Sequence, residues 1–382
     1  MKAARVPAPA VPIKASTGVV GFDEITGGGL PRGRTTLLVG GPGSGKTILS
    51  LQFLVHGAVH CGEPGIFVAF EETSKRVMDN AAGFGWKLAE LKRNRLYFLD
   101  AQPTPDLVKS GDFDLAGMLA ALAIQATEMK AKRIVFDALD MVLALLPDAA
   151  SKRREIYRLH EWLIAHSLTA IITAKSDSDE TSSIGQQPFR SMLFMVDCAV
   201  ILKHDMVLGV SQRNLRIQKY RGTSFDENES PFLIGKSGFE VAILRTPLHA
   251  EVTSIRERVS SGVARLDTML GGGYYRGATV LVTGISGTAK TTLGGAFTQA
   301  ACARGERTLF VSFDSDGFEV VRNLASVGMQ LDQYVKNGCL RMISARTIAG
   351  SAEIFLMRIK ALAEEHGARS LVIDPVSTLS KS

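Results

Sequence analysis

Short apolar runs alternate with longer amphipathic stretches along most of this chain. Continuous apolar runs are typical of strands buried on both faces of a parallel sheet, and the stretches between them have helical periodicity. We expect strands at residues 35–39, 65–70, 95–99, 133–137 and 168–174, an antiparallel closing pair at 197–204 and 214–219, and helices at 48–54, 74–86, 115–130 and 152–166. This order predicts an α/β fold in which helices flank a mostly parallel sheet.

The same pattern occurs twice, at a constant offset of 244 residues. The matching segments are 17–23 with 261–267, 27–33 with 271–277, and 40–47 with 284–291. A repeat this long indicates tandem domains. The expected parts are a flexible leader at 1–16, a first domain at 17–245, a linker at 246–258 and a second domain at 259–382.

The second copy is expected to be incomplete at its C-terminal end. Only eight residues follow Asp374, which ends a strand expected at 370–374, whereas the first domain continues far beyond its matching Asp137. The closing strands have no counterpart in the second copy. We therefore expect an exposed sheet edge beside residues 370–374, which favours association with other strands.

Composition narrows the class of protein. With 46% hydrophobic and 21% charged residues, the 382-residue chain is typical of globular proteins, and it has no apolar run long enough to span a membrane. The leader lacks the apolar segment of a signal peptide, and the four cysteines are too scattered for a zinc site or a disulfide framework, which favours a cytoplasmic location. The net charge of +6 is not concentrated in a basic run, so we expect no nucleic-acid partner.

Residues 40–47 read GGPGSGKT and match the phosphate-loop pattern GxxxxGK[ST] between an expected strand and an expected helix. In such a loop, backbone N–H groups surround the phosphates of a nucleotide, the lysine reaches the β and γ oxygens, and the hydroxyl binds Mg²⁺. The residues expected to bind ATP in the first domain are Gly41, Pro42, Gly43, Ser44, Gly45, Lys46, Thr47 and Ile48. Those of the second domain are Ser286, Gly287, Thr288, Ala289, Lys290, Thr291 and Thr292. Ala289 stands where the pattern requires glycine.

Aspartates end the matching strands of the two domains. The strand at 133–137 ends abruptly in Asp137, which is the Walker B pattern, and Asp374 is its counterpart in the second domain. Such a carboxylate holds Mg²⁺ beside the hydroxyl of the phosphate loop. We therefore expect metal sites at Thr47 with Asp137 and at Thr291 with Asp374.

Glu71 and Glu72 follow the strand at 65–70, at the sheet edge where the γ-phosphate is expected. One of them is expected to be the general base that orients or deprotonates the attacking water, while Lys46 neutralises charge. The second domain has Asp314 and Ser315 at the matching positions. It therefore lacks one carboxylate and has a shorter one in place of the other.

These motifs together resemble a known family. Residues 17–33 read TGVVGFDEITGGGLPRG, and with GGPGSGKT, the Glu71-Glu72 step, Asp137 and the turn Lys219-Tyr220-Arg221-Gly222 they resemble the KaiC branch of the RecA superfamily over nearly the whole chain. The resemblance implies tandem RecA-like P-loop domains and a hexameric ring with ATP bound between subunits. It implies that Lys219, Tyr220 and Arg221 reach the neighbour's nucleotide, and that Glu71 and Glu72 are the catalytic pair. A role in circadian rhythm and a Ser/Thr autokinase activity in the second domain are implied as well.

Three classes of function follow. The first is a tandem ATPase whose complete first domain hydrolyses ATP, while the shortened second domain lacks the segment that carries the family's phosphoacceptors. The second is a timing or signalling module, in which ATP occupancy sets ring assembly and regulatory protein partners read its state. The third is a DNA-directed ATPase or recombination factor. An aromatic and basic pore loop would favour the third class, but residues 175–187 are acidic and lack an aromatic side chain.

Overall fold

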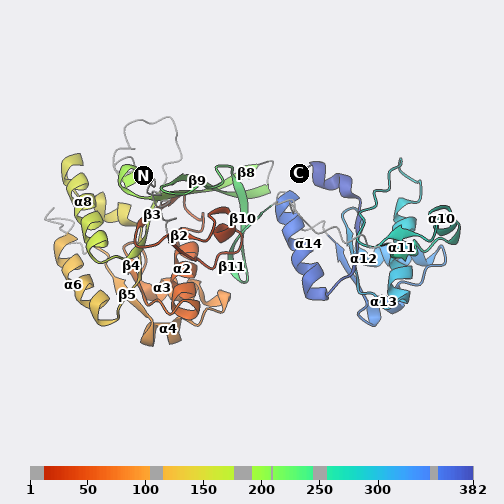
Figure 1. The fold of residues 1–382 in the computed structure, drawn as a ribbon, viewed down its shortest axis with the longest axis horizontal. Helices are drawn as coiled ribbons and strands as arrows, with labels where there is room; N and C mark the ends of the chain where they lie inside the picture. The colour runs from red at the N-terminus through yellow and green to blue at the C-terminus, as the bar shows by residue number, and fades with distance from the viewer. Residues whose placement is uncertain are drawn as a thin grey trace, which may run out of the picture. The chain divides into compact units, whose positions relative to one another are not determined.

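The computed structural model of this chain describes residues 13–103, 115–175, 192–207, 210–243, 256–344 and 352–381. Contacts between residues divide the chain into two compact units, residues 1–243 and 244–382 (Figure 1). Both are α/β units with parallel strands, which confirms the expected fold class. Most of the expected leader, most of the expected linker and the polar stretch after Lys175 lie outside the described residues.

The first unit is built on one large sheet. Among the described residues, nine strands lie in the order β11, β10, β9, β8, β3, β7, β6, β4, β5. They are β3 (Thr35–Gly40), β4 (Gly65–Ala69), β5 (Leu96–Asp100), β6 (Arg133–Asp137), β7 (Thr169–Lys175), β8 (Cys198–Val207), β9 (Val210–Tyr220), β10 (Ser230–Gly235) and β11 (Gly238–Val241). Strands β3 to β8 pair in parallel, while β9, β10 and β11 extend the sheet in antiparallel fashion. The mostly parallel sheet and its antiparallel closing pair are as predicted.

Helices cover both faces of this sheet. They are α1 (Phe22–Ile25), α2 (Lys46–His60), α3 (Ser74–Asn80), α4 (Leu88–Asn94), α6 (Leu115–Glu128), α7 (Leu139–Leu143) and α8 (Ala149–Ala165). A small separate ladder joins β1 (Lys14–Ala15) to β2 (Leu30–Pro31). The helix expected near residue 152 begins at Ala149 instead, because the Asp148 carboxylate caps it by accepting the N–H of Ser151 at 2.8 Å.

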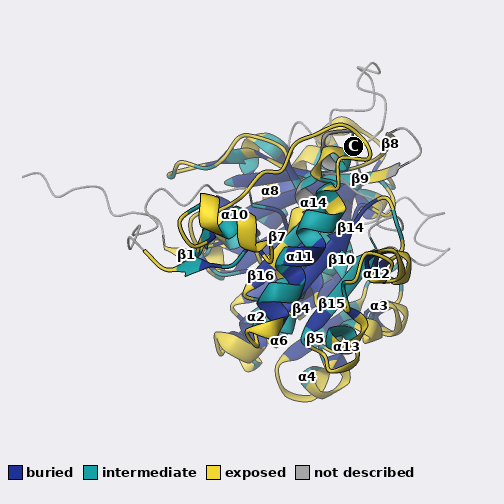
Figure 2. Ribbon diagram, turned by 90° about the vertical axis from the view of Figure 1, so that its right-hand side faces the viewer, coloured by how far each residue is buried: buried dark blue, intermediate teal, exposed yellow. Residues whose placement is uncertain are grey.

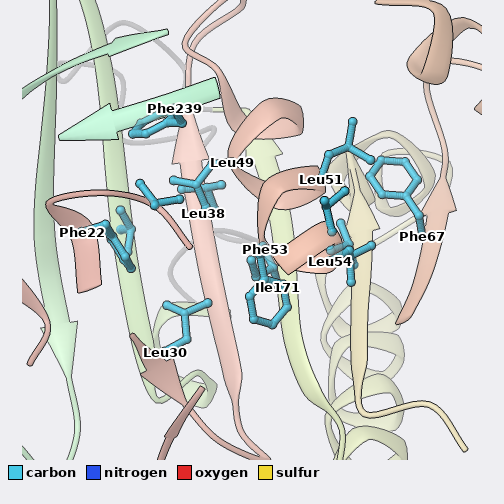
Figure 3. Close-up of a cluster of buried hydrophobic side chains, with 14 of the residues drawn as sticks. Phe22, Leu30, Leu38, Leu49, Leu51, Phe53, Leu54, Phe67, Ile171 and Phe239 are labelled. Atoms are coloured by element: carbon cyan, nitrogen blue, oxygen red, sulfur yellow. The ribbon is translucent and has the colours of Figure 1, made fainter. Parts of the chain in front are cut away.

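The apolar runs of the sequence form two cores, one on each face of the sheet. Leu38 of β3 packs with Phe53 of α2 and Phe239 of β11 on one face (Figure 3). Its neighbour Leu37 points to the other face and packs in a cluster with α6, α7 and α8. In Figure 2 the buried residues accordingly concentrate in the strands, and the exposed residues lie on outer turns and on helices such as α10. A strand that is buried on both sides has no polar face, which explains the continuous apolar runs.

One helix is shorter than the sequence predicts. The helix α3 starts where expected, since the Thr73 hydroxyl accepts the N–H of Arg76 at 3.4 Å, but it ends at Asn80 and does not reach Trp86. A short 3₁₀ turn follows, and Gly85 then adopts a left-handed φ of 70°. Gly85 thus ends the 3₁₀ turn, whereas Ala81, the C-cap of α3, keeps a right-handed conformation.

The second unit repeats part of this design. Its described strands are β12 (Arg258–Val259), β13 (Tyr274–Tyr275), β14 (Thr308–Ser312), β15 (Leu340–Ser344) and β16 (Ser370–Asp374). Its described helices are α10 (Ala264–Met269), α11 (Lys290–Ala303), α12 (Gly317–Ala325), α13 (Asp332–Lys336) and α14 (Ala352–His366), and a 3₁₀ helix η2 spans Val376–Lys381. Strands β15, β14 and β16 form a parallel sheet in that order. Because β16 pairs only with β14 among the described residues, the expected exposed edge beside residues 370–374 is present.

The segment that leads into the second phosphate loop is not a strand. In the first unit β3 pairs with β7 on one side and β8 on the other. The matching residues 279–284 have no strand partner in the described part of the second unit, and Leu281 is 71% exposed. A groove of about 670 Å³ lies between this segment and β16, with Val280, Val282 and Val372 in its wall. It occupies the place that β7 fills in the first unit.

Candidate nucleotide site

The first phosphate loop lies at the carboxyl end of β3 and leads into α2, in the middle of the sheet (Figure 1). Gly43 and Gly45 have φ values of 70° and 94°, in the left-handed region that favours glycine. The ammonium of Lys46 donates to the carbonyl oxygens of Gly40 and Gly41, at 2.6 and 3.0 Å. The predicted loop residues 41–48 thus form one turn whose lysine and helix start are suited to bind an anion.

Thr47 and Asp137 lie side by side, as the sequence predicts. The Thr47 hydroxyl donates to Asp137 Oδ2 at 2.9 Å, and the hydroxyl of Thr173 on β7 donates to Oδ1 at 2.7 Å. Burial raises the pKa of Asp137, and these two hydrogen bonds oppose that effect. Thr173 also accepts the backbone N–H of Ala138 at 2.7 Å, so it fixes the turn after the strand.

The oxygen atoms of this pair fit a magnesium ion. Carboxylate and hydroxyl oxygens are hard donors, and Mg²⁺ in nucleotide sites takes one or two protein ligands and completes its shell with phosphate and water. In the described part of the chain, no three His, Cys, Asp or Glu side chains converge to hold a metal. Thr47 and Asp137 are thus suited to an ion that arrives with the nucleotide.

The two glutamates after β4 point to different partners. Glu71 accepts the ammonium of Lys175 at 2.7 Å, at the strand end that borders the phosphate loop. Glu72 accepts Asn80 Nδ2 at 3.2 Å and lies 3.7 Å from Arg76 Nε, so its carboxylate faces α3. The sequence could not separate the two residues. The structure directs Glu71, and not Glu72, toward the phosphate loop.

Two further charged residues beside the loop were missed in the sequence. Lys175, the last residue of β7, begins a polar stretch in the sequence, and Asp140 belongs to none of the sequence motifs. The hydrogen bond to Glu71 is the main cause that raises the pKa of Lys175, and the charge of Asp140 adds to it. Burial raises the pKa of Asp140, while the charges of Lys175 and Lys46 oppose that shift. Strand order, which the sequence does not reveal, brings these residues together.

The ion pair between Glu71 and Lys175 is weak. The two side chains are 45% and 36% exposed. Exposed ion pairs of this kind contribute about 0–1 kcal/mol, because water screens the charges and both side chains lose conformational freedom. Little free energy is therefore lost when the ion pair breaks and one of its side chains binds a more highly charged group.

The turn at residues 219–221 packs against its own unit. Tyr220 is 5% exposed, and its hydroxyl donates to a backbone carbonyl oxygen at 2.8 Å. Lys219 Nζ donates to the carbonyl of Leu193 at 2.6 Å, and an Arg221 NH group donates to that of Phe194 at 2.9 Å. Tyr220 is therefore a packing residue in this structure. The contacts of Lys219, Tyr220 and Arg221 with a neighbour's nucleotide stay a prediction.

The second unit repeats the geometry of the loop. Lys290 Nζ donates to the carbonyl oxygens of Gly284 and Ile285, at 2.9 and 2.7 Å, and the Thr291 hydroxyl donates to Asp374 Oδ2. The predicted residues 286–292 form the turn and the first residues of α11. The loop lysine and the pair of metal-site residues are thus arranged as in the first unit.

The acidic step after β4 is not repeated in this unit. Asp314 and Ser315 follow β14 where Glu71 and Glu72 follow β4. The backbone N–H of Ser315 donates to the Ser312 hydroxyl at 3.2 Å, which closes the turn. No carboxylate as long as that of Glu71 occupies this turn.

A phosphate loop at the carboxyl edge of a RecA-like parallel sheet, with a threonine and a strand-ending aspartate beside it, defines the class of P-loop NTPases. The family model described as "ATPase: KaiC" matches residues 15–245 and 259–382. This chain belongs to the KaiC family of ATPases.

Curated relatives share this similarity over nearly the whole chain. The circadian clock protein KaiC2 of Synechocystis sp. is 37% identical over 373 residues, which cover 97% of this chain and 65% of KaiC2. The circadian clock oscillator proteins KaiC of Parathermosynechococcus lividus and Parasynechococcus marenigrum are 35% and 36% identical over 370 residues, covering 96% of this chain and 68% and 72% of theirs. The chain thus spans 65% to 72% of the length of these three relatives.

The helices give no sign of a membrane span. In the ranges that the structure describes, none is both long enough and apolar enough to cross a bilayer.

Proposed function

We propose that the first unit binds ATP with Mg²⁺ and hydrolyses it. The observation that carries this proposal is the convergence at one sheet edge of the Lys46 ammonium, the Thr47–Asp137 pair and the Glu71 carboxylate. These groups supply phosphate binding, metal binding and a base, which are the parts that phosphoryl transfer to water requires.

Hydrolysis would proceed by in-line attack. The oxygen of a water molecule bonds to the γ-phosphorus while the bond from that phosphorus to the β,γ-bridging oxygen breaks, and ADP leaves. Glu71 orients the water and accepts its proton, and Lys46 neutralises charge on the transferred phosphoryl group. Mg²⁺ at Thr47 and Asp137 would supply further neutralisation of the phosphate oxygens. Glu72 is the weaker candidate for the base, because its carboxylate faces Arg76 and Asn80.

The second unit is proposed to bind a nucleotide without rapid hydrolysis. Lys290 and the Thr291–Asp374 pair support binding. Asp314 is one methylene shorter than Glu71, and Ser315 has no carboxylate. At these two positions, the second unit therefore lacks a carboxylate that reaches as far toward the attacking water as Glu71 does in the first unit.

Self-association, with a hexameric ring as its form, is the second part of the proposal. It is supported by the sequence resemblance to the KaiC branch described above and by Lys219 and Arg221, two cations beside each other at one end of β9 in the first unit. In such a ring, ATP occupancy would set assembly, and a regulatory protein could read the assembled state in timing or signalling.

Steady-state ATPase measurements with Mg²⁺, together with molar mass in solution with and without ATP, test both parts. We expect turnover and an increase in mass with ATP. Terminally labelled ATP in the same reaction shows whether a serine or threonine of the chain becomes phosphorylated. A protein that neither turns over ATP nor changes mass would contradict the proposal.

A mixing experiment tests whether the site is shared between chains. Arg221→Ala and Lys46→Ala subunits lack different halves of such a site, so mixed interfaces regain one complete site and part of the activity. Folded, co-assembled mixtures without any recovery would show that each site is built within one chain.

A further inference from the structure

Lys175 stands between the two halves of the nucleotide site. It ends β7, and β7 lies between β3, which leads into the phosphate loop, and β6, which ends in Asp137. Its Cα is paired with that of Gly40, whose carbonyl oxygen accepts the Lys46 ammonium. The strand order therefore brings a second lysine to the start of the phosphate loop.

The two lysines repel each other at this edge. Burial is the main cause that lowers the pKa of Lys46, and the positive charge of Lys175 lowers it further. The carboxylates of Asp137, Asp140 and Glu71 act in the opposite direction. Two ammonium groups that share one sheet edge are stabilised by an anion that can contact both, and a chain of phosphates is such an anion.

Lys175 can exchange its present partner, Glu71, for a phosphate group. Its ion pair with Glu71 is partly exposed, whereas a terminal phosphate carries more charge and more acceptor oxygens than a carboxylate. Glu71 is also the residue assigned as the base. A side chain that holds Glu71 therefore decides whether that carboxylate is free to orient water.

We propose that Lys175 is a second phosphate-contacting lysine, which leaves Glu71 for the terminal phosphate when ATP is bound and keeps Glu71 when ADP is bound. Release of Glu71 then couples the presence of the γ-phosphate to the availability of the base. This inference rests on the proposed ATP site of the first unit. It gives that site a second contact to the γ-phosphate, besides that of Lys46, by which it distinguishes ATP from ADP.

Affinity measurements by calorimetry test the inference. The probes are ADP and the non-hydrolysable ATP analogue AMP-PNP, both with Mg²⁺, and every protein carries Lys290→Met so that the first site dominates. The variant is Lys175→Met. The matched control is Lys92→Met, which removes the same charge from α4, beside the amino end of β5.

Lys175→Met is expected to weaken AMP-PNP binding by about tenfold or more, the usual effect of losing a charge-assisted hydrogen bond. Its effect on ADP should stay within about twofold, because Lys175 keeps Glu71 when no γ-phosphate is present. Both effects of Lys92→Met should be equally small, because Lys92 loses only an exposed charge and a cation–π contact with Phe98. Equal weakening of both nucleotides by Lys175→Met, or unchanged AMP-PNP binding, would overturn the inference.

The inference and the proposed function can fail separately. The expected difference between AMP-PNP and ADP in a protein without ATPase activity would support the role of Lys175 and contradict hydrolysis. An active ATPase in which Lys175→Met leaves that difference unchanged would do the reverse.

Discussion

Gly45 and Ala289 occupy matching positions before α2 and α11 and share a left-handed backbone conformation, with φ values of 94° and 61°. A Cβ added to Gly45 would lie 2.7 Å from Ile234 Cδ1 and 3.3 Å from a ring carbon of Phe239, because β10 and β11 cover this turn. Ala289 is exposed, and no described strand covers it. The first loop thus requires glycine at this position for two reasons, the left-handed conformation and the lack of space for a Cβ. In the second loop, only the left-handed conformation disfavours alanine.

Exchanging these residues should have opposite effects on stability. Ala289→Gly removes the strain of an alanine in the left-handed conformation, which should stabilise the second unit by about 1 kcal/mol. The higher conformational entropy of glycine in the unfolded chain reduces this gain. Gly45→Ala adds both strain and overlap, and is expected to cost the first unit about 2 kcal/mol or more. Chemical unfolding followed by tryptophan fluorescence reports on the first unit alone, because both tryptophans lie in it. A destabilising effect of Ala289→Gly on amide exchange in α11 would contradict this account.

The two loop lysines should contribute unequally to turnover. Lys46→Ala is expected to abolish ATPase activity and nucleotide-dependent assembly, because it removes the phosphate contact of the site that also has Glu71. Lys290→Ala is expected to have the smaller effect, since the second site has only Asp314 and Ser315 after its strand. Steady-state rates of the two variants at saturating ATP decide the matter. Equal losses would show that hydrolysis does not reside mainly in the first unit.

Single substitutions should separate the two glutamates. Glu71→Gln is expected to keep ATP affinity and to lower turnover by about 10²-fold or more, the usual scale for the loss of a general base. Glu72→Gln is the matched control and should have the smaller effect, because that carboxylate contacts Arg76 and Asn80. Single-turnover rates, with affinity measured separately, distinguish chemistry from binding. A larger loss in Glu72→Gln would reassign the base.

The second unit should lose stability in acid through Glu306. Burial alone would raise the pKa of Glu306, but hydrogen bonds from Arg304 and Arg276 lower it to about 2, from an ordinary value of 4.5. A carboxylate whose pKa is lower in the folded chain stabilises that chain above the unfolded pKa, and its contribution is lost as pH falls from about 4.5 toward 2. Glu306→Gln should therefore destabilise β14 near neutral pH and have a shrinking effect in acid. Amide exchange of β14 peptides against pH measures this, and a pH-independent difference would contradict it.

Local pattern was enough to predict the parts of the site that are adjacent in sequence. The phosphate loop, the strand ending in Asp137 and the acidic step at Glu71 each depend on a few neighbouring residues. The contact between Glu71 and Lys175 joins residues 104 positions apart, and it exists because β4, which precedes Glu71, and β7, which ends in Lys175, flank β6 in the sheet. Alternation along β9 likewise could not show that Tyr220 is buried, because a bulge in the ladder with β8 skips Gln218 and moves Tyr220 to the core face of Leu215 and Ile217. The length of α3 was overestimated because the hydrophobic pattern does not show where the α-helix gives way to the 3₁₀ turn at Ala82–Phe84.

The unpaired segment at 279–284 links nucleotide affinity to strand pairing. Its first-unit counterpart β3 is held by hydrogen bonds to two neighbouring strands, so the loop beyond it is ordered before any nucleotide arrives. The second loop extends from backbone without such a ladder, and part of its binding free energy must go into ordering that backbone. A strand added beside β16 would order residues 279–284 before the nucleotide binds, and the affinity of the loop for the nucleotide would rise. If the second loop binds a nucleotide as proposed, the affinity of that site would therefore depend on what occupies the neighbouring position in its sheet.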